Sequence, residues 1–391
     1  MRRTTLLLTL AALGAMPAPA AAIPVFARRY RMSCAACHNP VPALTEFGEA
    51  FAGNGFRLFP GEPPRDTMDT GDELLALQGG LPLAVRLDLY VQAYAGSNAA
   101  ADFEAPYVLK LLSSAPISTS LSYYFYGFLA ERGEVAGLED AYLHWNDAGG
   151  VVDVMLGQFQ LSDPMFKRET RLTFEDYAAY RARVGDAPTD LTYDRGVYGV
   201  ADVAGVTLSG LVVNGNGIGE ADDARRFDDD PLKTAVLHAR LPEVGPLRLG
   251  GFGLYGETRA DGLENRTTMV GVDASLGAGP LALSVQYLHR EDTHPRYLAG
   301  EPTVATDGGF AELMYRPGGS RWYGVALYNL VVADAPLLDV RLGGPAGVRR
   351  WETVSGGGGY VLRRNLRLMT ELGYNLDAED FRWTSGFVVA F

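Results

Sequence analysis

The chain has 391 residues, a formal net charge of −13, and a high content of glycine (47 residues) and tyrosine (20 residues). Proteins that bind nucleic acid carry a basic surface, so the acidic balance argues against nucleic acid as a partner. After residue 22 there is no run of the roughly 20 consecutive apolar residues that a transmembrane helix needs. The glycine and tyrosine content fits many short strands and tight turns better than a helical enzyme.

Residues 1–22 have the parts of a secretory signal peptide. Arg2 and Arg3 form the basic start, residues 4–13 are apolar, and three alanines at 20–22 form an A-x-A-type cleavage site. The apolar run is too short to span a bilayer as a helix. We therefore expect an exported protein.

Residues 34–38 read CAACH, which is the Cys-x-x-Cys-His pattern of covalent c-type haem attachment. Cys34 and Cys37 lie three positions apart, so one short turn can present both thiols to the haem vinyl groups. His38 would then be the proximal ligand of the haem iron. These are the only two cysteines of the chain, which leaves room for one haem c. The alternatives are a Cys-x-x-Cys redox pair and a chance match.

Residues 23–75 are expected to form a small, partly α-helical haem-binding segment. A helical pattern over 43–52 precedes the sequence Gly53-Asn54-Gly55, which is typical of a helix end. About fifty residues with one short helix cannot enclose a haem in an apolar pocket. We therefore expect the rest of the chain to supply the walls.

Residues 81–391 show the alternation of a transmembrane β-barrel. In residues 81–94, apolar side chains alternate with polar or aromatic ones, as in a strand with two different faces. Seven short turns alternate with eight longer polar connections, which delimit about sixteen strands, an even number typical of single-chain bacterial barrels. The predicted fold is all-β: an antiparallel outer-membrane barrel of about 16 strands with the small haem segment at its N-terminus.

The last strand, residues 383–391, places Trp383, Phe387, Val389 and Phe391 on one face and ends the chain on an aromatic residue. This ending resembles the C-terminal signature of bacterial outer-membrane proteins. Together with the signal peptide, it predicts a location in the bacterial outer membrane, in contact with its lipid.

The longest connection, residues 161–195, stands apart from the others. Its second half, 175–183, has a helical pattern that ends before Gly185. In a wide barrel such a loop can fold inward and constrict the lumen. Its basic residues are either paired within a solvated loop or directed at the haem propionates; they are Lys167, Arg168, Arg171, Arg181 and Arg183.

Two further groups of side chains remain open in their role. A sixth haem ligand is not identified, and the possible donors are His144, His238, His289, His294, Met68 and Met165. The predicted external connections carry acidic residues that are either simply solvated or attract hard cations such as Fe²⁺; they are Glu220, Asp222, Asp223, Asp228, Asp229, Asp230, Glu291, Asp292, Asp377, Glu379 and Asp380.

The haem segment resembles a known family. The sequence PVFARRYRMSCAACH at 24–38, followed by Phe47-Gly48 and by NGF at 54–56, is similar to the fused cytochrome–porins of the outer membrane. Their best-known members are iron oxidases of Fe(II)-oxidising bacteria. GQFQLSDPMFKRE at 157–169 and LTYDRG at 191–196 also look like that family. The resemblance implies one haem at or within a sixteen-stranded barrel, with Cys34, Cys37 and His38 in the family's haem roles.

These observations predict an outer-membrane electron-transfer conduit. A single haem in a polar lumen would shorten the electron path across a hydrocarbon layer about 30 Å thick. The expected donor is extracellular, with Fe(II) the leading choice, and the expected acceptor is a periplasmic c-type cytochrome. Such a protein would act as an Fe(II):cytochrome c oxidoreductase. The alternative function is a porin that transports small solutes or anions, with the haem structural or sensory.

Overall fold

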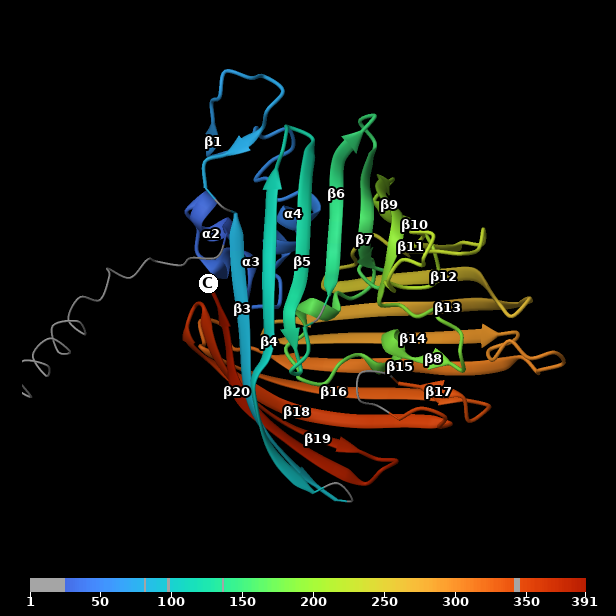
Figure 1. The fold of residues 1–391 in the computed structure, drawn as a ribbon. Coiled ribbons are helices and arrows are strands. Elements are labelled where there is room, and N and C mark those ends of the chain that lie inside the picture. The colour runs from blue at the N-terminus through green and yellow to red at the C-terminus, as the bar shows by residue number, and fades with distance from the viewer. Residues whose placement is uncertain (1–24, 81, 97–98, 136, 341–344) are drawn as a thin grey trace, which may run out of the picture.

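The computed structural model describes residues 25–80, 82–96, 99–135, 137–340 and 345–391 (Figure 1). Within these ranges sixteen strands form one closed antiparallel barrel, which confirms the predicted fold class. The barrel strands are β3 (Leu83–Ala95), β4 (Ala100–Pro116), β5 (Leu121–Glu131), β6 (Leu138–Ala148), β7 (Val152–Gln160), β9 (Tyr193–Val203), β10 (Val206–Val213), β11 (Thr234–Arg240), β12 (Leu247–Ala260), β13 (Leu263–Ala278), β14 (Leu281–Asp292), β15 (Val304–Tyr315), β16 (Trp322–Ala333), β18 (Arg350–Arg363), β19 (Leu366–Asn375) and β20 (Asp380–Ala390).

The barrel closes where the last strand, β20, pairs with the first, β3. Beyond β20, the backbone of Phe391 exchanges hydrogen bonds with that of Val85, with N···O distances of 2.6 and 2.8 Å. The aromatic rings of Trp383 and Phe387 are exposed on this seam. The C-terminal strand is therefore a full member of the barrel wall, as predicted.

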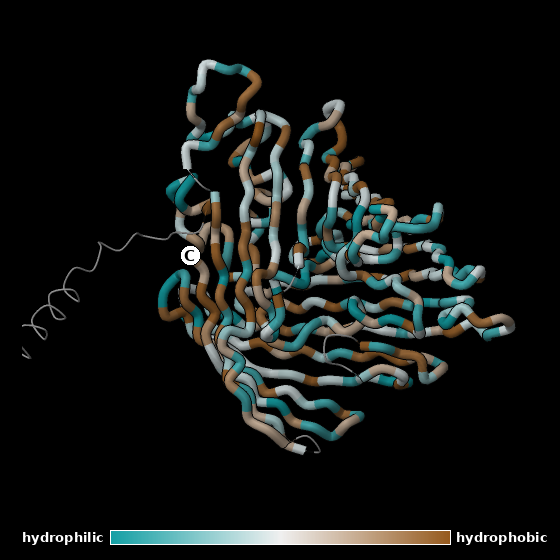
Figure 2. The backbone as a smooth tube through the Cα atoms, in the orientation of Figure 1, coloured by the Kyte–Doolittle hydropathy of each residue, from teal (hydrophilic) through white to brown (hydrophobic). Residues whose placement is uncertain are grey.

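Hydrophobic and hydrophilic residues alternate along the barrel strands (Figure 2). On β6, Asp140 and His144 are buried inside the barrel, whereas Leu143 and Trp145 are 45% and 54% exposed. A barrel whose apolar side chains point outward and whose polar side chains point inward matches a hydrocarbon surrounding. Closure also leaves no unpaired backbone edge in lipid. The prediction of a bacterial outer-membrane barrel is confirmed.

The alternation of loop lengths is only partly as predicted. The connection expected over residues 257–264 is a two-residue turn between β12 and β13. Its residues, Asp261 and Gly262, have φ angles of 51° and 78°. Asp-Gly is a favoured pair for such hairpins because both positions need positive φ. Two long strands therefore meet in a tight hairpin at an end where a polar loop was predicted.

The N-terminal segment contains α2 (Val25–Tyr30), α3 (Cys34–Cys37), α4 (Glu46–Gly53) and a small hairpin of β1 (Thr67–Met68) and β2 (Leu77–Gln78). It lies at the end of the barrel where the short turns gather (Figure 1). Short turns mark the periplasmic end of outer-membrane barrels. The predicted signal peptide, 1–22, lies outside the described residues. Among the helices of the described ranges, none is both long and apolar enough to cross a bilayer.

Arg57 fixes this segment to the barrel mouth. Its guanidinium is 1% exposed and donates to the carbonyls of Ser118 and Leu121 at 2.7 and 2.9 Å. It also donates to Oδ1 of Asn146 at 2.9 Å. The ring of Phe56 stacks on that of Tyr124, with centroids 5.3 Å apart. The N-terminal segment is thus docked on backbone carbonyls beside the β4–β5 turn and on the side chains of Asn146 and Tyr124.

The connection between β7 and β9 folds into the barrel, as predicted for residues 161–195. It contains a 3₁₀ turn, η1 (Arg168–Thr170), the helix α5 (Ala178–Arg181), and β8 (Arg183–Val184), which pairs with β17 (Leu338–Asp339). The helix predicted over 175–183 is therefore only one turn long. Hydrogen bonds to Asn329, Gln286 and Glu371 on the facing strands hold the connection across the lumen. The connection is therefore held by hydrogen bonds to the barrel wall and not by the backbone hydrogen bonds of a regular helix.

The placement of the outward face in lipid can be tested by introducing a charge on it. Replacing Leu143, at the middle of β6, by Arg should lower the free energy of unfolding in lipid vesicles by about 2–4 kcal/mol, because a cation would enter the hydrocarbon. Leu276→Arg, near the short-turn end of β13, should cost only about 0–1 kcal/mol. Denaturant titration of the vesicle-inserted protein measures both values. Equal costs at the two positions would contradict the membrane placement.

Candidate haem site

The CAACH sequence folds as one tight turn. Ser33 caps α3 by accepting a hydrogen bond from the backbone N–H of Ala35 at 3.2 Å. The backbone N–H of His38 donates to the carbonyl of Cys34 at 2.8 Å, which ends the turn. Cys34 and Cys37 are half-buried and are not joined in a disulfide. Both thiols thus leave a single short turn, as covalent attachment at two vinyl groups requires.

His38 is oriented in the way that suits an iron ligand. Its Nδ1 lies 3.0 Å from the carbonyl oxygen of Pro42. Because a carbonyl can only accept, Nδ1 carries the proton and Nε2 keeps its lone pair. Metal-binding histidines commonly donate their other ring N–H to a backbone carbonyl in this way. Burial lowers the pKa of His38, which favours the neutral imidazole that metals bind.

Helix α4 supports the turn from behind. Thr45, at its N-cap, donates from its hydroxyl to the carbonyl of Ala36 at 2.7 Å. At Gly48 a Cβ atom would lie 2.2 Å from the carbonyl oxygen of Cys37. Only glycine permits this approach. The sequence Phe47-Gly48, noted above for its resemblance, therefore has a packing role directly beneath the cysteines.

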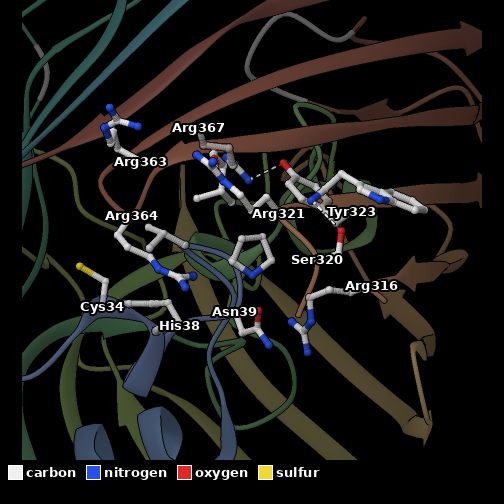
Figure 3. Close-up of a pocket in the computed structure, with 15 residues that line it drawn as sticks. Cys34, His38, Asn39, Arg316, Ser320, Arg321, Tyr323, Arg363, Arg364 and Arg367 are labelled. Atoms are coloured by element: carbon white, nitrogen blue, oxygen red, sulfur yellow. Dashed lines mark hydrogen bonds between the residues drawn. The ribbon is translucent and has the colours of Figure 1, made fainter. Parts of the chain in front are cut away.

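An open cleft separates the turn from the barrel wall (Figure 3). It holds about 470 Å³, counting the part open to solvent. Cys34 and His38 line one side. The other side comes from the short turns that join β15 to β16 and β18 to β19, and it contributes five arginines: Arg316, Arg321, Arg363, Arg364 and Arg367.

The arginines give this cleft a positive charge in a chain that is acidic as a whole. None of the five forms an ion pair with a residue in the described ranges, and Asp and Glu are absent from the described residues lining the cleft. Arg321 donates from Nε to the carbonyl of Val361 at 2.7 Å, and Arg367 donates from Nη1 to the Tyr323 hydroxyl at 2.8 Å. Guanidinium groups are good partners for carboxylates. Cys34, an imidazole nitrogen of His38 and cations without ion pairs line the cleft, and Cys37 lies in the same turn as Cys34 outside that lining; these groups fit a haem c.

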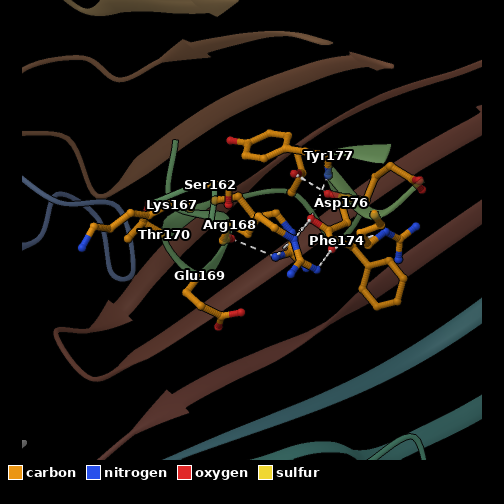
Figure 4. Close-up of polar contacts among 12 residues, drawn as sticks. Ser162, Lys167, Arg168, Glu169, Thr170, Phe174, Asp176 and Tyr177 are labelled. Carbon is orange, nitrogen blue, oxygen red and sulfur yellow. Dashed lines mark hydrogen bonds and ion pairs between the residues drawn. The ribbon is translucent and has the colours of Figure 1, made fainter. Parts of the chain in front are cut away.

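These arginines were missed by sequence reasoning, which considered only the cations of residues 161–195 for the propionates, with pairing inside their own loop as the alternative. In the structure those loop cations do not line the cleft. Arg168 instead pairs with Asp176, as Figure 4 shows, and Arg183 pairs with Asp190 at 2.8 Å. A signal was present in the sequence. Three arginines fall within five residues at 363–367, on a short turn predicted at the same barrel end as the haem segment.

The possible sixth ligands named above lie elsewhere, because the cleft is lined by none of the six. His144 lies 3.2 Å from the amide of Asn146, and His238 pairs with Asp273 at 2.9 Å, so both are hydrogen-bonded lumen side chains. His289 faces outward beside Asp307. Met165 packs in the apolar core under the inward connection, and Met68 is exposed on β1.

The acidic groups predicted on external loops have partners of their own. Asp228, Asp229 and Asp230 bring carboxylate oxygens within 4.8 Å of one another. Asp228 pairs with Lys233 at 2.5 Å. Asp292 is not on a loop but lies buried at the end of β14, where it pairs with Arg290 at 2.6 Å. These contacts favour solvated or structural roles.

No protein-family model and no curated protein matches this chain. Solved structures do match its fold. An anion-selective porin from Comamonas acidovorans is 12% identical, covering 80% of this chain and 99% of its own, with a TM-score of 0.59. OmpT from Vibrio cholerae (trimer form) is 12% identical, covering 79% and 98%, with a TM-score of 0.56. The outer-membrane channel DcaP of Acinetobacter baumannii is also 12% identical, covering 79% and 96%, with a TM-score of 0.56. The barrel therefore has the porin fold.

The contacts of Arg57 predict that its replacement will loosen the haem segment from the barrel mouth. Arg57→Ala removes three hydrogen bonds from a charged donor, and we expect the segment to be held less tightly by about 2–4 kcal/mol. Backbone hydrogen exchange in α4 measures this loosening. Arg65→Ala, which removes a partly exposed ion pair on the same segment, should change exchange by less than about 1 kcal/mol. Equal effects would contradict the docking role of Arg57.

The thiols predict a pH dependence of alkylation. Burial raises the pKa of both Cys34 and Cys37 above the ordinary 9.0. In haem-free folded protein, iodoacetamide should therefore react more slowly at pH 8 than in urea-unfolded protein, and the rate should rise steeply above pH 9, because only the thiolate reacts. Mass spectrometry counts the labelled cysteines. Equal rates in folded and unfolded protein at pH 8 would contradict the buried arrangement.

Proposed function

We propose that this protein is an outer-membrane electron-transfer barrel that carries one covalent haem c and passes electrons from an extracellular donor, with Fe(II) first, to a periplasmic c-type cytochrome. The observation that carries the proposal is the cleft at the barrel mouth. There Cys34 and a histidine with a free Nε2 face a group of unpaired arginines. When bound, haem c supplies reversible one-electron chemistry.

The residues of the cleft have separate tasks in this proposal. Cys34 and Cys37 would hold the haem through two thioether bonds, and His38 would ligate the iron, with its ring held by the carbonyl of Pro42. The arginines at the β15–β16 and β18–β19 turns would neutralise the propionates. Since this group lies at the short-turn end, a periplasmic acceptor can approach the cleft directly.

A second candidate function is solute transport, and the porin fold supports it together with the space inside the barrel. Beyond the inward connection the lumen holds a polar space of about 1790 Å³, counting the part open to solvent. In this alternative the barrel passes small hydrophilic solutes and the haem has a structural or sensory role. The two functions differ in whether the haem exchanges electrons with a donor.

Covalent attachment is tested in cells that mature c-type cytochromes. The wild-type protein should keep haem on a denaturing gel, and the double variant Cys34→Ala, Cys37→Ala should lose it completely, because no thioether can form. Ser320→Ala, on the opposite wall of the cleft, should keep its haem. Haem that remains on the double variant, or its absence from the wild type, would contradict the proposed attachment.

Electron transfer is tested by spectroscopy of the purified haem-bearing protein. Addition of Fe²⁺ should convert the oxidised haem spectrum to the reduced one, and an added oxidised cytochrome c should reverse the change. If Fe²⁺ leaves the spectrum unchanged, while the same protein conducts small solutes in planar bilayers, the Fe(II)-conduit proposal fails and the transport function is favoured.

The arginines of the cleft predict the sign of a redox change. Replacing both Arg363 and Arg364 by Gln removes two positive charges beside the haem, which disfavours the added electron. The midpoint potential should fall by about 20–40 mV, corresponding to roughly 0.5–1 kcal/mol for one electron. Arg259→Gln, on the distant β12–β13 hairpin, should leave the potential unchanged. An unchanged potential in the double variant would show that these arginines do not face the haem.

A further inference from the structure

The lumen beside the inward connection forms a second space, partly open to solvent, which we call the luminal chamber. It is lined by the inward connection and by residues of strands β3, β4, β5, β6, β9, β18, β19 and β20. Nine of its lining residues are Arg or Lys, against seven Asp or Glu, although the chain as a whole carries a net charge of −13. The chamber is thus lined by more basic than acidic side chains, although the chain as a whole is acidic.

Most carboxylates of the luminal chamber are already engaged by a cation. Lys110 lies between Glu139 and Glu169, at 2.8 and 2.6 Å. Arg382 pairs with Glu175 at 2.7 Å. Arg86 likewise pairs with Asp88, and Arg183 with Asp190. These contacts leave little negative charge for the cations that remain.

The remaining cations are only partly satisfied. Arg171 donates from Nη1 to the carbonyl of Arg168 at 2.8 Å, while its Nε is unpaired. Asp176 is a single carboxylate facing three guanidinium groups. Arg168 takes both of its oxygens, whereas Arg171 and Arg181 approach only to 3.6 and 3.7 Å (Figure 4 shows the Arg168 contact). Two guanidinium charges are therefore in excess at this carboxylate.

Arg181 is the clearest case. It is 8% exposed, and its guanidinium makes no hydrogen bond to any residue in the described ranges. Arg367, 5% exposed, has no carboxylate partner there and donates only to the Tyr323 hydroxyl, while its Nε is unpaired. Buried charges that lack a close, hydrogen-bonded counter-charge are costly, and Arg181 has only the distant contact with Asp176. An arrangement of this kind is stable when an anion completes it.

We propose that the luminal chamber binds a small polycarboxylate through Arg171, Arg181 and Arg367. Guanidinium groups match carboxylates with paired N–H donors. The cations come from the inward connection and from β19, so an anion with more than one carboxylate can engage both elements. The site uses no residue of the haem segment, although Arg367 also lines the cleft at the barrel mouth.

The experiment is calorimetric titration of the detergent-solubilised full chain with citrate, with inorganic phosphate and with Fe(III)-loaded citrate. Wild-type protein should bind citrate saturably and more tightly than phosphate. Arg181→Gln should weaken citrate binding by about tenfold, the loss expected for a hydrogen bond between charged groups. Arg226→Gln, on an exposed loop and paired with Asp222, is the matched control and should bind as wild type does.

The other outcomes are equally decisive. No saturable citrate binding by the wild type, or unchanged binding by Arg181→Gln, would overturn the proposal. Tighter binding of phosphate would overturn the assignment to polycarboxylates. If Arg181→Gln fails to fold, Arg171→Gln, whose side chain is partly exposed, provides the same test. Equal affinity for free and Fe(III)-loaded citrate would assign the site to the free anion, and tighter binding of the loaded form to its metal complex. Haem-free protein should also bind citrate saturably and should bind it more weakly after Arg181→Gln, which separates this result from the proposed function.

Discussion

The structure depends on one constraint: a backbone N–H or C=O group in hydrocarbon must be paired within the protein. Sixteen strands meet it by closing on themselves, with β20 against β3. Closure then decides the direction of every side chain, because apolar groups must face lipid and polar groups the lumen. Charged chemistry is thereby confined to the interior and the two rims. The docking of the N-terminal segment depends on this division. The polar interior and rim offer hydrogen-bond acceptors, and Arg57 donates to three of them.

Much of the fold could be predicted from sequence because the alternation of strands is local. Leu143 and His144 take opposite faces for reasons that are visible in their neighbours. The Asp261-Gly262 turn was missed because the polar residues around it suggested a loop, although the pair itself favours a hairpin. The helix predicted over 175–183 is short because Asn329, Gln286 and Glu371, distant in sequence, support the chain there. Such long-range contacts are not visible in a local pattern.

The candidate site could likewise be predicted from the sequence only in part. Cys34, Cys37 and His38 form a contiguous motif, so their identification needs no tertiary information. The arginines opposite them come from two turns that are nearly fifty residues apart and far from the motif. Only barrel closure brings these turns to one rim. For Arg168 and its neighbours the sequence left open whether they pair within their loop or contact the propionates, and the structure pairs Arg168 with Asp176 of the same connection.

Arg367 has a position that connects the two spaces. It lines both the cleft at the mouth and the luminal chamber, and it donates a hydrogen bond to Tyr323, a residue of the cleft wall. A charge that arrives in the chamber acts on the cleft across this single buried side chain, where the low dielectric weakens the field little. The electrostatic environment at the inner rim therefore depends in part on the charges that the lumen holds.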